Sequence, residues 1–140
     1  MLRPSRFMRR FVISAYFLLA AAATAAQGID YAGFVRSLRA ENTTIEPQGE
    51  VEQPFFSVTG KVIALYGDHV QIFEHPGSAE ADAEAALVSP DGMTVGTAKP
   101  HWLGTPHFYR KDRLLVLYLG DNEKVLKALK ARLGRQFAGG

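Results

Sequence analysis

The chain has 140 residues, no cysteine and a net charge of +2, from 16 basic and 14 acidic residues. The absence of cysteine excludes disulfides, thiol nucleophiles and cysteine-zinc sites. Four arginines fall within the first ten residues. Without them the chain has 12 basic and 14 acidic residues, a net charge of −2. This charge argues against a nucleic-acid-binding domain.

The N-terminus has the layout of a secretory signal peptide. A basic stretch ends at Arg10, and an apolar run of 16 residues follows from Phe11 to Ala26. As a helix this run is about 24 Å long, shorter than a hydrocarbon core of about 30 Å. Its last residues include an A-T-A tripeptide ending at Ala25, which matches a cleavage site.

This layout predicts that residues 1–25 are a signal peptide and that residues 26–140 form a single α+β domain. The predicted location is the periplasm or the outside of the cell. The alternative is an uncleaved N-terminal helix that anchors the protein in the membrane, with its arginines on the cytoplasmic side.

An N-terminal helix is predicted between Asp30 and about Glu41. Asp30 has a side chain suited to an N-cap, and Phe34, Val35 and Leu38 lie at helical spacing.

A hairpin and a second helix follow. Strands over residues 61–66 and 69–74 are predicted to flank a turn at Gly67-Asp68. Ser78 is the expected N-cap of an alanine-rich helix that ends near residue 88.

The second half repeats this order. A strand that begins around Trp102 and leads to Phe108-Tyr109 is predicted to precede a turn at Lys111-Asp112, and a second strand over residues 113–119 follows this turn. Asp121 is the expected N-cap of a helix over residues 122–133. The predicted fold is therefore α+β: two hairpin-helix (ββα) units share one antiparallel sheet, both of their helices cover one face, and an additional helix precedes them.

Six consecutive apolar residues, Leu114–Leu119, form the last predicted strand. A strand without alternation is normally covered on both faces. The second face could be covered by the N-terminal helix, by the loop around Phe55-Phe56 or by another protein.

The densest group of candidate binding residues lies between residues 101 and 109. Trp102, His107, Phe108 and Tyr109 could line a pocket that stacks an aromatic or sugar ring, with His107 and Tyr109 donating hydrogen bonds. The alternative is a bent strand whose aromatic side chains fill the core.

Catalytic and metal-binding patterns are weak. The four histidines, His69, His75, His101 and His107, show no metal-ligand spacing, so we expect no metal site and no cofactor. The carboxylates of residues 80, 82 and 84 are expected on a solvated helix face. An enzyme that uses His107 and Tyr109 as acid and base is the remaining catalytic hypothesis.

Charge is segregated along the chain. Residues 41–91 hold ten acids and one base, whereas residues 99–135 hold nine bases and three acids. A basic surface of Lys124, Lys127, Lys130 and Arg110 could meet an anionic envelope polymer or lipid headgroup. Alternatively, the acidic and basic helices lie side by side and offset each other.

Several short segments resemble a group of small exported bacterial proteins of unknown function. They are residues 53–56 (QPFF), 89–92 (SPDG), Trp102, 106–109 (PHFY), 116–121 (VLYLGD) and 136–140 (QFAGG). The resemblance covers most of residues 26–140. It implies export, and it implies no activity, cofactor or catalytic residue.

The sequence thus favours an exported, non-catalytic binding module of the cell envelope or extracellular space. Its site would be the segment from Trp102 to Tyr109, or the sheet face over Leu114–Leu119. A small-ligand carrier with an aromatic pocket is the second hypothesis, and the enzyme is the third. The expected partner is an envelope protein or a small ligand rather than a nucleic acid, with a membrane involved only if the N-terminal segment is uncleaved.

Overall fold

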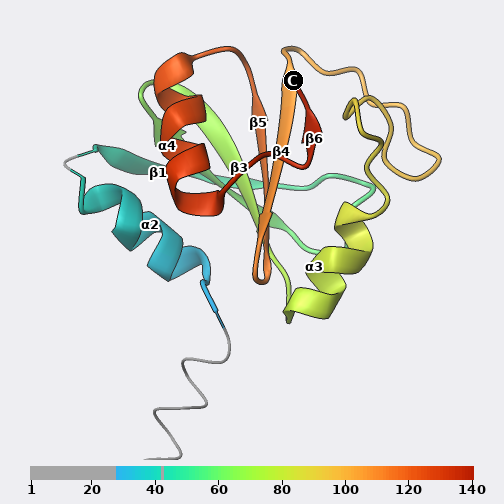
Figure 1. Cartoon of the computed structure of the whole chain (residues 1–140), viewed down its shortest axis with the longest axis horizontal. Helices are drawn as coiled ribbons and strands as arrows, with labels where there is room; N and C mark the ends of the chain where they lie inside the picture. Colours follow the sequence, from blue (N-terminus) through green and yellow to red (C-terminus); the bar gives the residue numbers. More distant parts are fainter. Residues whose placement is uncertain (1–27, 42) are drawn as a thin grey trace, which may run out of the picture.

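The computed structural model describes residues 28–41 and 43–140. Within these residues lie three helices and one six-stranded antiparallel sheet (Figure 1), which confirms the α+β class. The predicted signal peptide, residues 1–25, lies outside the described residues.

The sheet has the strand order β1-β2-β3-β5-β4-β6, and every neighbouring pair is antiparallel. The hairpins β2–β3 and β4–β5 therefore lie side by side in its centre. The strands are β1 (Ile45–Val51), β2 (Gly60–Leu65), β3 (Asp68–Glu74), β4 (Pro106–Lys111), β5 (Leu114–Leu119) and β6 (Ala138–Gly139).

The strand register defines two ends of the sheet. At one end, here called the Gly120 end, β5 finishes, β4 begins and β2 turns into β3. At the other, the Asp112 end, β4 turns into β5 and β3 finishes opposite the start of β5. In Figure 1 the Gly120 end is at the top and the Asp112 end is at the bottom.

The helices are α2 (Tyr31–Arg39), α3 (Ser78–Ala85) and α4 (Glu123–Leu133). Two predicted N-caps are wrong by one residue. Asn122, not Asp121, caps α4, because its side chain accepts a hydrogen bond from the Lys124 backbone N–H. Gly77, not Ser78, occupies the N-cap position of α3 and provides no side-chain bond.

Both hairpin turns also lie one residue from their predicted positions. The first turn is Tyr66-Gly67, with φ of 51° and 84°, and the second is Asp112-Arg113, with Asp112 at 50°. A two-residue hairpin that matches strand twist needs left-handed backbone at its centre. Gly67 supplies one such position at no steric cost, and Tyr66 accepts the other.

The helices cover opposite faces of the sheet, so the expectation that both ββα helices share one face is wrong. On one face α2 and α4 pack over Val70, Val116 and Tyr118. On the other face Phe73, Leu115 and Leu117 pack against side chains of the α3 region and of the loops around it, such as Ala85 and Phe56. The difference arises because each strand alternates its side chains, and the chain leaves β3 and β5 toward different faces.

The apolar strand Leu114–Leu119 is therefore covered on both faces by this chain itself. Residues 114–118 are fully buried between the two clusters. The sheet face over this strand is consequently not a free binding surface, which corrects that part of the sequence interpretation.

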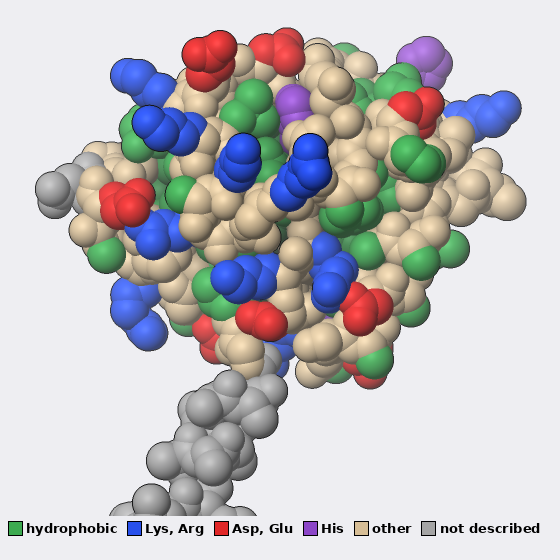
Figure 2. All heavy atoms as spheres, in the orientation of Figure 1, with side chains coloured by type: hydrophobic (Ala, Val, Ile, Leu, Met, Phe, Trp, Pro, Cys, Tyr) green, Lys and Arg blue, Asp and Glu red, His purple; other side chains and the backbone are tan. Residues whose placement is uncertain are grey.

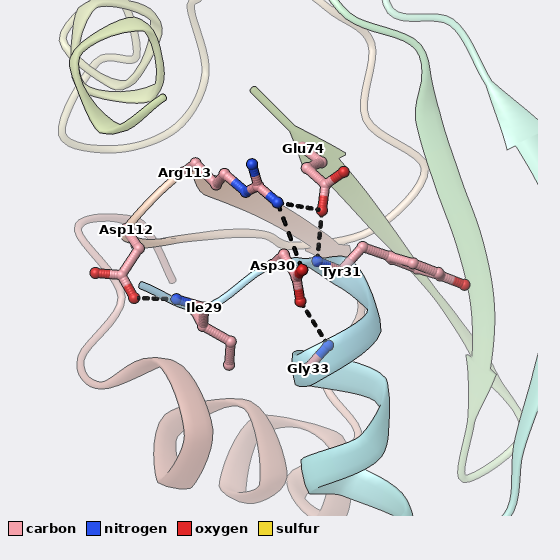
Figure 3. A network of polar contacts seen from close by, with 7 residues as sticks. All are labelled: Ile29, Asp30, Tyr31, Gly33, Glu74, Asp112 and Arg113. Atoms are coloured by element: carbon pink, nitrogen blue, oxygen red, sulfur yellow. Dashed lines mark hydrogen bonds and ion pairs between the residues drawn. The ribbon is translucent and has the colours of Figure 1, made fainter. Parts of the chain in front are cut away.

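Carboxylates at the Asp112 end fasten the start of α2 to the sheet (Figure 3). Asp112 accepts a hydrogen bond from the Ile29 N–H at 2.7 Å, and Glu74 accepts one from the Tyr31 N–H at 2.6 Å. Asp30 caps the helix by accepting from the Gly33 N–H, which lowers the pKa of its carboxyl. The Arg113 guanidinium lies 3.4 Å from Asp30 and 3.8 Å from Glu74 and joins the two carboxylates.

Candidate functional site

Trp102 and Phe108 belong to an aromatic cluster on the α3 side of the sheet. The Trp102 ring meets Phe55 and Phe108 edge to face, with centroid distances of 5.9 and 6.1 Å. Its indole N–H donates a 2.8 Å hydrogen bond to the Gly92 carbonyl. Phe108 is fully buried, and Trp102 is half-buried. The indole ring is thus held in one orientation with part of its surface exposed.

His107 and Tyr109 point to the opposite side of β4, toward α4. His107 is 6% exposed and stacks on Tyr118; its Nδ1 lies 2.7 Å from Gln136 Oε1 and its Nε2 lies 2.9 Å from the Gly120 carbonyl oxygen. Tyr109 is 2% exposed, and burial raises the pKa of its hydroxyl. Both ring nitrogens of His107 therefore lie next to protein oxygens, and the Tyr109 side chain is almost completely buried.

The structure brings Trp102 together with Phe108, and His107 together with Tyr109, but it separates these pairs by the thickness of the sheet. The four residues consequently do not line one pocket. A hollow of about 380 Å³ lies elsewhere, beside the start of β1 and the β2–β3 turn. It is lined by Thr43, Thr44, Glu46, Ala64, Tyr66 and Gly67, and it contains none of the predicted site residues.

Tyr118 forms a polar network next to His107. Its hydroxyl donates a 2.5 Å hydrogen bond to Asp68 and accepts one from the Asn122 N–H. Burial, together with the bond to Asp68, raises the pKa of Tyr118 to about 12. This network ties β3 to β5 and to the start of α4, so its geometry is explained by packing.

A buried histidine–carboxylate pair joins β3 to α3. His75 Nε2 lies 2.6 Å from Glu84 Oε2, and the second carboxylate oxygen accepts a 2.7 Å bond from the Ser57 N–H. Burial raises the pKa of Glu84, but the hydrogen bonds from Ser57 and His75 outweigh burial and hold this pKa below its ordinary value. The spacing predicted that Glu84 lies on a solvated helix face, and this prediction is wrong.

Sequence reasoning missed this pair because its partners come from three separate segments. The one sequence feature that pointed to this pair is the position of His75 directly after a buried strand. The His75 ring is fully buried, so it faces protein rather than an open cleft. Among residues 28–41 and 43–140, no three His, Asp or Glu side chains come together in a way that could hold a metal ion.

Two of the exposed apolar side chains, Tyr66 and Leu103, lie at the Gly120 end. Leu103 is fully exposed, and the other large apolar residues with substantial exposure, between 37% and 49%, are Tyr66, Leu87, Met93 and Phe137. Tyr66 is in the β2–β3 turn, Leu103 precedes β4, and Phe137 precedes β6, whose Gly139 pairs with His107.

The loop that carries Leu103 is fixed at two points. The Trp102 indole binds the Gly92 carbonyl, which brings Leu103 close to the segment of Met93. Thr105 accepts a 2.9 Å bond from the Gly120 N–H, directly after β5. Leu103 therefore projects into solvent from a loop that is held on both sides, rather than from a free chain end. No periodic pattern in the sequence distinguishes such a residue from a core leucine.

The broad face over α4 is basic. Lys124, Lys127 and Lys130 are exposed on this helix, and within the described part of the chain none of them forms an ion pair. Arg110, the fourth residue of the predicted basic surface, instead pairs with Asp82 of α3. Figure 2, in which α4 lies on the left and α3 on the right, shows Lys and Arg side chains across the view with Asp and Glu side chains among them.

Comparison with known proteins gave no match to a family model, a curated protein or a solved structure. The resemblance to small exported bacterial proteins therefore stays a prediction. No helix in residues 28–41 and 43–140 is long and apolar enough to cross a membrane.

Proposed function

We propose that this protein is an exported, non-catalytic binding module that contacts its partner with the Gly120 end of the sheet. The observation that carries the proposal is the fully exposed Leu103, held in a fixed loop beside the half-buried Trp102. Large apolar side chains that are fixed and exposed together are typical of interaction surfaces.

The neighbouring side chains support a surface that binds without chemistry. His107 and Tyr109 are the acid and base of the enzyme hypothesis. Both ring nitrogens of His107 lie next to protein oxygens, and Tyr109 is 2% exposed. A general acid or base has to come within hydrogen-bonding reach of a substrate. Of the four residues predicted from sequence, Trp102 alone borders the exposed surface, so the proposed site moves from residues 107–109 to residues 93, 102, 103 and 137.

The export part of this proposal rests on the N-terminal sequence. A basic stretch, an apolar run and an A-x-A tripeptide precede the described residues. The described chain begins at the Asp112 end, where Ile29 binds Asp112. The proposed binding surface is at the other end of the sheet.

Photo-crosslinking in the native cell tests the binding surface. A benzophenone amino acid in place of Leu103 should give a discrete adduct, whereas the same probe in place of Ala79 should not. Ala79 is exposed in the first turn of α3, which follows the Asp112 end of β3. Equal adducts from both positions, or none from position 103, would contradict the proposal.

We also infer that the fold consists of two hairpin–helix units with α2 as an additional N-terminal helix. The support is the chain order: β2 and β3 precede α3, and β4 and β5 precede α4. The pairing of β3 with β5 sets the two hairpins against each other in the sheet. Both units have the same chain order of two strands and a helix, although their helices cover opposite faces of the sheet.

A further inference from the structure

We propose that His107 is a protonation switch: its charged imidazole ring holds the C-terminal segment, residues 136–140, on the sheet, and its neutral ring releases this segment. The C-terminal segment contains β6, which lies beside β4 (Figure 1). The proposal concerns a change within the fold, so it does not depend on the function proposed above.

The two groups that face the ring nitrogens of His107 are both hydrogen-bond acceptors. The Gly120 carbonyl oxygen lies 2.9 Å from Nε2, and Gln136 Oε1 lies 2.7 Å from Nδ1. A neutral imidazole ring has one N–H group, whereas the imidazolium ring has two. Only the charged ring can therefore donate a hydrogen bond to both oxygens at once.

A turn of the Gln136 amide does not remove this conflict. In the present orientation Gln136 Nε2 donates a 3.0 Å hydrogen bond to the Gly139 carbonyl. If the amide turned over, Nε2 could donate to a neutral His107, but Oε1 would then face the Gly139 carbonyl oxygen. Each arrangement with a neutral ring therefore sets two acceptors against each other in a largely buried place, and the imidazolium ring avoids this cost.

The aromatic ring beside His107 also favours a positive charge. His107 stacks on Tyr118 with a centroid distance of 5.9 Å, and the Tyr118 hydroxyl donates a hydrogen bond to Asp68 of β3. The face of an aromatic ring attracts a cation, and a nearby carboxylate adds to this attraction. Tyr118 and the neighbouring Tyr109 stay neutral near pH 7, because burial raises the pKa of both hydroxyls.

The other segments around the ring carry few charges. Asp121 follows Gly120 and Arg135 precedes Gln136, but both of these charged side chains are exposed, so salt and solvent screen them. The side chains of α4 that pack toward the sheet are apolar, and the last three residues bring one carboxyl group, on Gly140. Aspartate, arginine and carboxyl groups ordinarily titrate outside the range of about pH 5–8, in which histidine changes its charge.

The C-terminal segment is short enough to respond to the loss of one bond. β6 has two residues, and its pairs with β4 are His107–Gly139 and Phe108–Ala138. Three backbone hydrogen bonds of 2.9 Å also hold the segment, from the N–H groups of residues 137, 139 and 140 to the carbonyls of residues 108, 90 and 106. A two-residue strand at the edge of a sheet opens locally at a low cost in free energy, so a lost bond to His107 shifts this equilibrium.

The C-terminal segment also supports the loop that orients Trp102. Gly139 packs against Gly92, where an added Cβ would come 3.1 Å from the Gly139 Cα, and the Gly139 N–H donates to the Pro90 carbonyl. The Gly92 carbonyl in turn accepts the hydrogen bond from the Trp102 indole. Release of the segment would therefore remove one support of this loop.

NMR spectroscopy of the ¹⁵N-labelled protein, as its own cell produces it, tests the proposal. At about pH 5.5 both ring nitrogens of His107 should carry a proton, and at about pH 8 one of them should. The Phe137, Gly139 and Gly140 amides should be protected against hydrogen exchange at least about tenfold more at the lower pH, after correction for the intrinsic exchange rate at each pH. Amides of the β2–β3 hairpin should change less than about threefold.

Two variants separate His107 from other titrating groups. Gln136→Leu removes the acceptor at Nδ1, so a neutral ring can satisfy Gly120 alone, and the pH dependence of the protection should fall below about threefold whatever its level. His101→Gln removes an exposed histidine from the same part of the chain and should leave the pH dependence intact. The titration of the wild-type ring stands even if a variant fails to fold.

The proposal is overturned if His107 has the same charge at both pH values, or if the ring titrates while the protection of the C-terminal segment stays constant. It is also overturned if Gln136→Leu keeps the wild-type pH dependence, or if His101→Gln loses it, because the effect would then belong to another group. The crosslink from position 103 is measured separately, so either proposal can fail without the other.

Discussion

At the scale of single residues, buried polar side chains of this protein each join two or three separate segments. Glu84 connects α3 to His75 at the end of β3 and to the Ser57 backbone. Tyr118 connects β5 to Asp68 and Asn122, and His107 connects β4 to Gly120 and Gln136. These groups have the residue types of catalytic sites, but their hydrogen bonds are made inside the fold, and the buried Nδ1 of His75 has no partner among the described residues.

Replacing Glu84 with Gln should destabilise the protein by about 1–3 kcal/mol at pH 7, the range expected for hydrogen bonds to a charged group. The loss should be constant above about pH 5. Because the pKa of Glu84 is lowered in the folded protein, its ionised form contributes stability above the unfolded pKa, and this contribution disappears as pH falls through the lowered value. Urea unfolding from pH 7 to pH 3 measures the change.

In that series the gap between wild type and variant should therefore narrow below about pH 4.5, near the ordinary pKa of the carboxyl. Glu80→Gln, on the exposed surface of the same helix, is the matched control and should cost less than about 0.5 kcal/mol. A constant gap for Glu84→Gln over the whole pH range would show that the charge of Glu84 is not what holds α3.

At the scale of elements, local patterns predicted three of the four hairpin strands to within a residue, whereas the strand expected from around Trp102 begins only at Pro106. These patterns did not predict which face of the sheet each helix covers. Apolar spacing identifies the buried side of α4, yet the spacing is the same whichever face of the sheet receives it. The direction is decided by the connections after Glu74 and Leu119, which carry no periodic signal.

The candidate site shows the same limit. The period of two in β4 could have separated Phe108 from His107 and Tyr109, because neighbouring strand residues point to opposite faces. The exposure of Leu103 could not be predicted from the sequence. It depends on the hydrogen bonds that hold its loop to Gly92 and Gly120, and no sequence pattern indicates these bonds.

The cap of α4 offers a test at this scale. Asn122→Ala should lower the free energy of unfolding by about 1 kcal/mol, because it removes the bond to the Lys124 N–H. Asp121→Ala should cost only a few tenths, since this side chain interacts with the helix dipole without capping it. Thermal unfolding compares the stability of the two variants directly. A larger loss of stability for Asp121→Ala would indicate that Asp121 is the N-cap, as the sequence predicted.

At the scale of the whole molecule, the two ends of the sheet differ in chemistry. The Asp112 end carries the ionic network of Asp30, Glu74 and Arg113 and receives the start of the described chain (Figure 3). The Gly120 end carries Leu103 and its apolar neighbours. The start of α2 is thus held at one end of the sheet, and the proposed binding surface lies at the other.

The central claim, that the Gly120 end binds a partner, is tested most directly by ¹⁹F NMR of 5-fluorotryptophan at Trp102. Trp102 is the single tryptophan of the chain and directly precedes Leu103, so the signal reports on this surface alone. We predict one resonance that shifts or broadens when an extract of the host envelope is added, and no such change in Leu103→Asp. A resonance that neither shifts nor broadens when the extract is added, or that changes equally in Leu103→Asp, would contradict the claim.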